Sequence, residues 1–120
     1  FKAEAAADRL AEMMTQDPDE SVRTAAATAL SQSKSPKAVV LLIRQAEEGG
    51  EWPTRLMAAR AAAARYGFAA DAFGARMDRA SWNNRIERIK ALPAVEEAFE
   101  ACGVPLVRRP EHLIELPDEH

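Results

Sequence analysis

The strongest constraint on the fold is a helical pattern that repeats about every 30 residues. The pairs Val22-Arg23, Thr54-Arg55 and Asn84-Arg85 occupy equivalent positions, 32 and 30 residues apart. Around each pair, apolar residues follow the three- and four-residue spacing of one helix face. A single hairpin of this length cannot bury its apolar face, so neighbouring hairpins have to stack. The repeat therefore predicts an all-α chain of stacked helical hairpins.

Alanine supports this prediction, because it makes up 26 of the 120 residues. Alanine has the highest helix propensity, and its small side chain lets helices pack closely. Asp17 and Ser81 are expected to cap two of the helices, and Pro36 and Pro93 to open two others. The predicted helices cover residues 3–14, 18–30, 36–48, 52–66, 69–80, 82–92 and 93–102.

Residues 17–30 read DPDESVRTAAATAL. This segment resembles the first helix of a HEAT repeat, of the short type shared with bilin-lyase subunits. The resemblance extends over residues 1–103 and is strongest over 17–50. It implies a short right-handed α-solenoid of about three HEAT-like hairpins, in which residues 3–14 form a leading helix.

The last 17 residues break the repeat. Pro105, Pro110 and Pro117 prevent a continuous helix. Six aliphatic side chains make residues 104–120 too apolar for a solvated tail, so we expect an extended strap that covers the open end of the last hairpin. A disordered tail is the alternative. The predicted organisation is a repeat domain over 1–103 followed by a strap over 104–120.

The composition excludes several classes of protein. A single cysteine, Cys102, excludes an internal disulfide and a cysteine metal cluster. The sequence has no glycine-rich phosphate loop, HExxH motif or serine nucleophile elbow. We therefore predict no catalytic residue, no metal, no cofactor and no membrane partner. We expect a cytoplasmic protein, and the start at Phe1 suggests a piece of a longer chain.

Three arginines recur once in each repeat. Arg23, Arg55 and Arg85 hold the same position of successive first helices. One interpretation is a structural ladder, in which each arginine bonds a carboxylate or carbonyl of the adjoining unit, as the HEAT resemblance suggests. The other is a row of arginines that lines a groove. We favour the ladder.

Positive charge is concentrated in the middle of the chain. Residues 55–90 carry eight basic and three acidic side chains, whereas the net charge of the whole chain is −3. The basic residues of this segment, here called the basic island, are Arg55, Arg60, Arg65, Arg76, Arg79, Arg85, Arg88 and Lys90. The island could attract an acidic partner or a phosphate backbone. Alternatively, it is a solvated helical face that the acidic C-terminal segment neutralises. The candidate partner-binding residues are Arg55, Arg60, Arg76, Arg79, Arg85 and Arg88.

The favoured function is a non-enzymatic scaffold or adaptor that binds another protein or a further domain of its parent chain. The expected groove lies along the second helices, 37–48, 69–80 and 94–102. One alternative is a nucleic-acid-binding domain similar to HEAT-like DNA-repair glycosylases, which would need Asp71 or Asp78 near Trp82. A bilin-lyase-like subunit and a spacer without a ligand are further alternatives. Nucleic acid is the less favoured partner because the chain is acidic overall.

Overall fold

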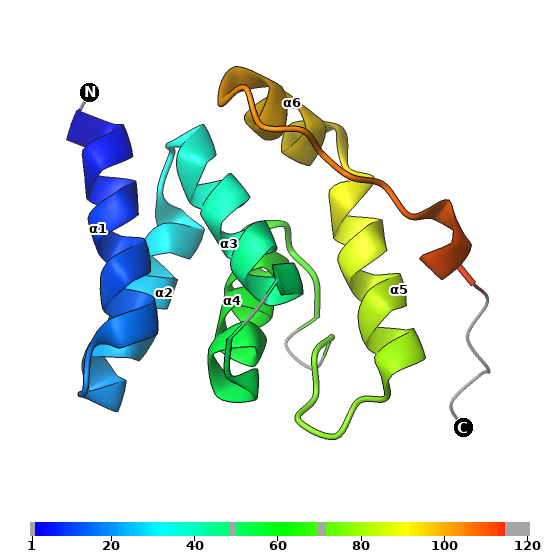
Figure 1. The fold of residues 1–120 in the computed structure, drawn as a ribbon, viewed down its shortest axis with the longest axis horizontal. Helices are drawn as coiled ribbons and strands as arrows, with labels where there is room; N and C mark the ends of the chain where they lie inside the picture. The colour runs from blue at the N-terminus through cyan, green and yellow to red at the C-terminus, as the bar shows by residue number, and fades with distance from the viewer. Residues whose placement is uncertain (1, 49, 70–71, 115–120) are drawn as a thin grey trace.

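The computed structural model describes residues 2–48, 50–69 and 72–114. These residues form six α-helices and one short 3-10 helix, and contain no strand (Figure 1). The elements are α1 (Lys2–Gln16), α2 (Glu20–Gln32), α3 (Pro36–Glu48), α4 (Trp52–Arg65), α5 (Arg79–Lys90), α6 (Pro93–Ala101) and η1 (Pro110–His112).

The helices pack in pairs that stand side by side. α1 packs against α2 and α3 against α4, while α1 contacts α3 and α2 contacts α4 across the two pairs. α6 continues the layer of α1 and α3, and α5 stands at the far side with the C-terminal segment (Figure 1). The prediction of an all-α chain with the packing of a short helical solenoid is confirmed.

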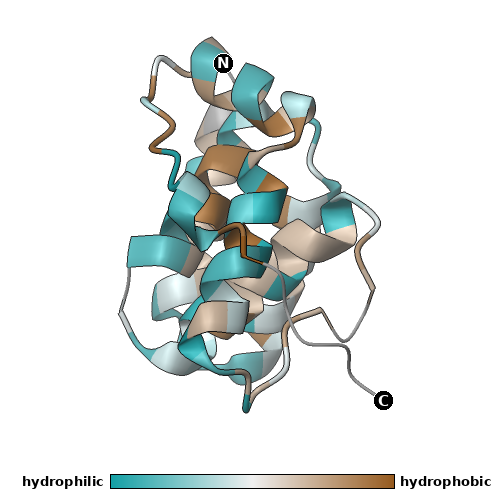
Figure 2. Ribbon diagram, turned by 90° about the vertical axis from the view of Figure 1, so that its right-hand side faces the viewer, coloured by the Kyte–Doolittle hydropathy of each residue, from teal (hydrophilic) through white to brown (hydrophobic). Residues whose placement is uncertain are grey.

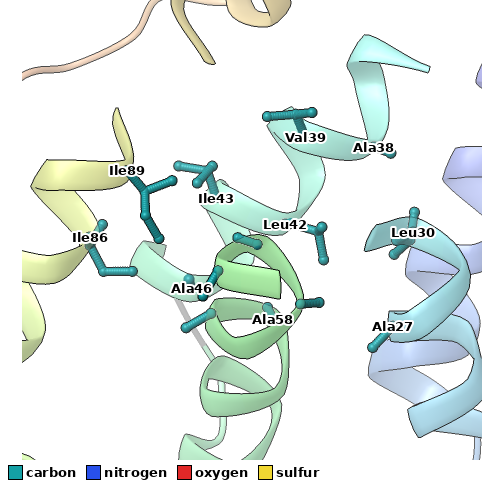
Figure 3. Close-up of a cluster of buried hydrophobic side chains, with 14 of the residues drawn as sticks. Ala27, Leu30, Ala38, Val39, Leu42, Ile43, Ala46, Ala58, Ile86 and Ile89 are labelled. Atoms are coloured by element: carbon teal, nitrogen blue, oxygen red, sulfur yellow. The ribbon is translucent and has the colours of Figure 1, made fainter. Parts of the chain in front are cut away.

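One apolar core joins all of the helices. It runs from Ala7 of α1 to Phe99 of α6 without a break into separate clusters. Twelve of the buried core residues in the described part of the chain are alanines, whose small side chains let the helices lie close. Figure 3 shows Ile86 and Ile89 of α5 directed toward Ile43 and Ala46 of α3. On the side that carries α5, the hydrophobic residues gather where helices face one another, and hydrophilic ones cover the outer turns (Figure 2).

The helices begin at capping residues and prolines as expected, but two of the N-caps differ from the predicted residues. α3 begins at Pro36, and the Lys37 N–H donates to Ser35 Oγ at 3.2 Å. α2, however, begins at Glu20 and is capped by Asp19, whose carboxylate accepts from Ser21 N at 2.8 Å. The prediction that Asp17 caps this helix was wrong. Asp19 lies directly before the first helical residue and has the extended backbone conformation of an N-cap, so it caps the helix instead.

α5 begins earlier than predicted. Asp78, rather than Ser81, is its N-cap, and the Asp78 carboxylate accepts from Ser81 N at 2.8 Å. This hydrogen bond from the Ser81 backbone lowers the pKa of Asp78, because it stabilises the charged form. The cap therefore fixes the first turn of α5 three residues upstream of the predicted position.

The second unit departs most from the prediction. No helix covers residues 69–80: residues 66–69 and 72–78 form turns and irregular backbone, and α5 takes over at Arg79. Gly67 has φ +74°, a conformation that ends α4. Phe73 is buried all the same, and its ring packs edge-on against Trp82 with centroids 4.8 Å apart. An irregular segment thus supplies the apolar contact for which a helix was expected.

The C-terminal segment lies along α5. Residues 104–109 are extended, η1 follows, and Val104 and Leu106 pack partly against the core. The described part of the predicted strap is therefore ordered against the helices through residue 114. Leu116 and Pro117 lie outside the described residues. The division of the chain at residue 103 stays a prediction.

Candidate functional site

A cavity of about 540 Å³ lies between α3, α5 and the segment after α6. Trp82, Ile86 and Phe99 form its apolar part. Arg44, from α3, and Arg109, from the strap, add basic groups to the lining. The lining therefore combines apolar side chains with charged ones of both signs, since Glu47 and Glu87 also belong to it, and its walls come from segments far apart in the sequence.

A buried cluster of charges stands at this cavity. Lys90 is fully buried, although it belongs to the predicted basic island. Its Nζ lies 2.8 Å from Glu47 Oε2 of α3 and 3.3 Å from Glu87 Oε2 of α5. Lys90 is therefore not part of a solvated basic face. It serves as a cation that ties α5 to α3, because a buried charge has to be paired.

Glu87 connects the same cluster to the strap. Its side chain is 1% exposed, and Glu87 Oε1 accepts from Arg108 Nε at 2.7 Å and from Arg109 N at 2.8 Å. Burial alone would raise the pKa of Glu87. The hydrogen bonds from Arg108 and the Arg109 backbone, with the charge of Lys90, outweigh burial and lower the pKa. Glu87 is therefore held as a carboxylate.

Asn84 provides a second buried attachment for the strap. Its Nδ2 donates to the main-chain carbonyls of His112 at 3.0 Å and Ile114 at 2.9 Å. Its Oδ1 accepts from Arg88 Nε at 2.9 Å. The amide thus has three hydrogen bonds, and Arg88 acts by orienting it. Two polar side chains of α5 therefore hold the strap, one near residue 108 and one near residue 113.

The three recurring arginines show where the repeat is regular. Arg23 Nη1 donates to the carbonyl of Asp17 at 2.7 Å, just after α1 ends. Arg55 donates to the carbonyls of Ala46 at 3.0 Å and Glu47 at 3.2 Å, in the last turn of α3. Both contacts satisfy main-chain acceptors at the C-terminal end of the preceding helix, where a cation is favourable. They support the structural interpretation for Arg23 and Arg55.

Arg85 differs from these two. Its Nε is buried and has no hydrogen-bond partner among the described residues. The equivalent acceptors would be the last carbonyls of a helix over 69–80, and in the described residues that helix is missing. The repeat therefore places an arginine where the fold no longer provides its acceptors.

Comparison with known proteins agrees with this geometry. A family model for HEAT repeats matches residues 1–63, just over half of the chain. The chain belongs to the HEAT-repeat family. No curated protein and no solved structure matches it significantly. HEAT repeats commonly mediate protein–protein interaction, and the family is typically non-enzymatic. Every helix that the structure describes is too short or too polar to span a lipid bilayer.

Further arginines of the HEAT chain also bind main-chain carbonyls. Arg65 Nη1 contacts the carbonyls of Ser31 at 3.3 Å and of Ser33, at the end of α2. Arg60 Nε donates to the carbonyl of Phe73 at 3.0 Å, which holds the irregular segment against α4. Sequence reasoning missed the role of Arg65. The signal is its place at the end of α4, since α2, the equivalent helix of the preceding pair, runs parallel to α4 and ends at the same level.

The candidate partner-binding residues therefore do not form one row. Arg55 faces the last turn of α3 and lies 5.9 Å from the Trp52 ring and 6.0 Å from the Trp82 ring. Arg76, Arg79 and Arg88 are exposed, and Arg88 is tied to Asn84. The groove expected along 37–48, 69–80 and 94–102 lacks its middle helix in the described residues, and α6 contacts α3 directly.

The groups that a glycosylase would need are not assembled in the described residues. Trp82 is buried between Trp52, with centroids 4.7 Å apart, and Phe73. Asp78 is exposed and caps α5. Asp71, the other candidate, lies outside the described residues. Within those residues no three His, Cys, Asp or Glu side chains gather as a metal site.

A second cavity, of about 800 Å³, follows the outer face of the HEAT units between α2 and α4. Its lining includes the hydroxyls of Thr24, Thr28 and Ser31, the side chain of Met57 and the guanidinium of Arg60. Three acidic and two basic side chains line it, so neither sign of charge dominates. The cavity beside α5 remains the better-defined candidate site.

Proposed function

We propose that this HEAT-repeat chain is a non-enzymatic protein-interaction module, a scaffold or adaptor within a larger cytoplasmic protein. Its partner is an acidic segment of another protein or of a further domain of the parent chain. Family membership supports a binding role. The observation that carries the proposal is the position of Arg76 and Arg79. Both are exposed, at the end of the irregular segment 72–78 and the start of α5.

This position favours recognition for two reasons. Irregular segments on a rigid scaffold are common sites of binding residues, because their side chains need not serve the core. The segment 55–90 also carries eight basic side chains against three acidic ones, in a chain of net charge −3. Lys90 is buried and ion-paired, so the exposed positive charge comes from arginines such as Arg76 and Arg79. A local positive field in an acidic protein selects an acidic partner and speeds its approach.

The test compares charge reversal on this surface with an equal reversal elsewhere. The chain, the variant Arg76→Glu/Arg79→Glu and the control Arg9→Glu/Lys34→Glu are immobilised, and partners from an extract of the source cells are captured. Arg9 and Lys34 are exposed, so the control changes net charge by the same amount on α1 and the α2–α3 turn. A partner identified with the wild-type chain is then purified, and its Kd is measured at several salt concentrations.

We expect the arginine reversal to weaken binding about tenfold or more, and the control to change it by less than about threefold. Affinity should fall as salt increases, because exposed charges are screened. Equal binding by all three chains would refute the proposed surface. Binding of the purified chain to duplex or single-stranded DNA, with the same dependence on the arginines, would favour the nucleic-acid alternative.

A further inference from the structure

We propose that the face of α5 under residues 104–114 is a binding site for extended, arginine-containing segments of other proteins, and that the strap occupies this site in cis. The face is distinct from the exposed arginines Arg76 and Arg79. The inference therefore goes beyond the proposed function and assigns a second kind of partner. It depends on how α5 holds the strap.

The first argument is the nature of the contacts. Asn84 is fully buried and Glu87 is 1% exposed, yet both direct their polar atoms at the strap. A segment that only shielded the end of the solenoid would need apolar contacts alone. Buried polar side chains are costly unless they are paired, so they specify a particular ligand backbone. Three of these contacts are to main-chain groups, which any extended peptide offers.

The second argument is that the site recognises one side chain of the strap, that of Arg108. Arg108 Nε donates to Glu87 Oε1 at 2.7 Å, and Arg108 Nη1 lies 3.4 Å from Glu96 Oε1 of α6. Two carboxylates from two helices thus bracket one guanidinium. Charge-assisted bonds of this kind give specificity for arginine. The neighbouring Arg109 contributes its main-chain N–H to Glu87.

The third argument is that the strap is shallowly embedded. Val107 is 58% exposed, and Leu113 and Ile114 are each 43% exposed. The strap begins after Gly103, which has φ +65°, so it leaves α6 at a residue suited to a change of direction. Val104 and Leu106 pack partly against the core, whereas residues 107–114 are attached mainly through polar contacts and keep much of their apolar surface outside. This part of the strap can therefore leave without opening the core.

These contacts define the ligand. It is an extended peptide with an arginine for Glu87 and Glu96, a free N–H on the next residue, and carbonyls four and six residues after the arginine for Asn84. Because the strap meets the same requirements from within the chain, at an effective concentration in the millimolar range, it competes with any such ligand.

The test uses the full chain and a fluorescein-labelled peptide of residues 103–114, with binding followed by fluorescence anisotropy. In the receptor, Arg108→Glu places a carboxylate of the strap against Glu87 and frees the site. Arg109→Glu is the matched control, since it makes the same charge change while keeping the main-chain contact. We expect the Arg108→Glu chain to bind the peptide at least tenfold more tightly than the wild-type chain, and the Arg109→Glu chain to stay within threefold of it.

The peptide is varied in the same way. An Arg108→Ala peptide should lose at least tenfold in affinity for the Arg108→Glu chain, whereas an Arg109→Ala peptide should lose less than threefold. Adding Asn84→Ala to the receptor should also weaken binding at least tenfold. Equal binding to the wild-type and Arg108→Glu chains, or equal binding of the two variant peptides, would overturn the proposal.

A measurement on the wild-type chain covers the case in which Arg108→Glu does not fold. Amide hydrogen exchange of residues 104–114 is followed with and without about 1 mM unlabelled peptide. Faster strap exchange with the peptide, and not with a scrambled one, supports displacement. Unchanged exchange refutes it. None of these experiments involves Arg76 or Arg79. A negative result for the α5 peptide site therefore leaves the proposed binding through Arg76 and Arg79 untouched, and a negative result for those two arginines leaves the α5 peptide site untouched.

Discussion

Lys90→Met is the most informative perturbation of the buried charge cluster. Lys90 is fully buried between Glu47 and Glu87, so the substitution removes the cation and leaves two carboxylates without it. Methionine is unbranched and of similar length, so it keeps most of the apolar packing. The free energy of unfolding should therefore change mainly through the lost charge.

The structure sets the size of the effect. Breaking a buried ion pair by removing one partner costs about 3–5 kcal/mol. Here Glu47 is 30% exposed and can be hydrated, and Glu87 keeps Arg108, so we expect the lower end, about 3 kcal/mol. The usual stability per residue gives a domain of this size a free energy of unfolding of about 6–18 kcal/mol. The variant should thus remain folded with a clearly lower midpoint.

Urea denaturation at pH 7 measures this loss. With an m-value near 1.5 kcal/mol/M, about 3 kcal/mol lowers the midpoint by about 2 M. The double variant Lys90→Met/Glu87→Gln should recover about 1–2 kcal/mol, because the second change removes the unpaired charge. Lys34→Met, at an exposed lysine, is the control and should stay within about 0.5 kcal/mol of the wild type. A Lys90→Met chain as stable as wild type, or two strictly additive changes, would refute the assigned role of Lys90.

Three further outcomes can be measured by thermal or urea unfolding. Arg55→Met should lower the free energy of unfolding by about 2 kcal/mol, because Arg55 binds two helix-end carbonyls beside two tryptophan rings. Arg85→Met should lower it by less than about 1 kcal/mol, because the Arg85 Nε has no partner among the described residues. Equal losses would contradict the structural ladder. Gly103→Ala should cost about 1 kcal/mol because of its φ of +65°, and Gly74→Ala, at a position with open space, should cost less. The pKa of Glu87 is lower in the folded chain, so the stabilising effect of Glu87 is complete above the ordinary pKa of 4.5 and is lost as the pH falls through the folded pKa. The urea midpoint of the Glu87→Gln chain should therefore decline less steeply than that of the wild type from pH 6 to pH 3. Parallel curves would contradict the assignment.

The regular part of the fold could be predicted because its signals are local. Ala26 and Leu30 of α2, or Leu42 and Ile43 of α3, lie on one face by spacing alone, and the structure buries them. Pro36 and Pro93 open helices as expected. Each of these features depends on residues within a few positions of one another, which a single sequence contains.

The irregular segment could not be predicted in the same way. Phe73 and Met77 are four residues apart, which indicates a helix when the positions are taken alone. The structure shows that Phe73 reaches Trp82 from a turn, so its burial needs no helix. The buried polar cluster was missed for a related reason. Asn84, Glu87 and Lys90 are polar, and their burial depends on a strap and on Glu47, far away in the sequence.

One missing helix accounts for the features that distinguish this end of the molecule. Without a helix over 69–80 in the described residues, the layer of α1 and α3 lacks its expected next member, and α6 contacts α3 instead. α5 contacts α4 through Trp82 and Trp52, and one of its faces carries the polar groups that hold the strap. The Nε of Arg85 lacks the kind of carbonyl partner that Arg23 and Arg55 use. The cavity between α3, α5 and the strap lies at this same end of the molecule. The candidate site therefore lies where the helical repeat becomes irregular. For this reason the repeat pattern in the sequence predicted the solenoid but not the site.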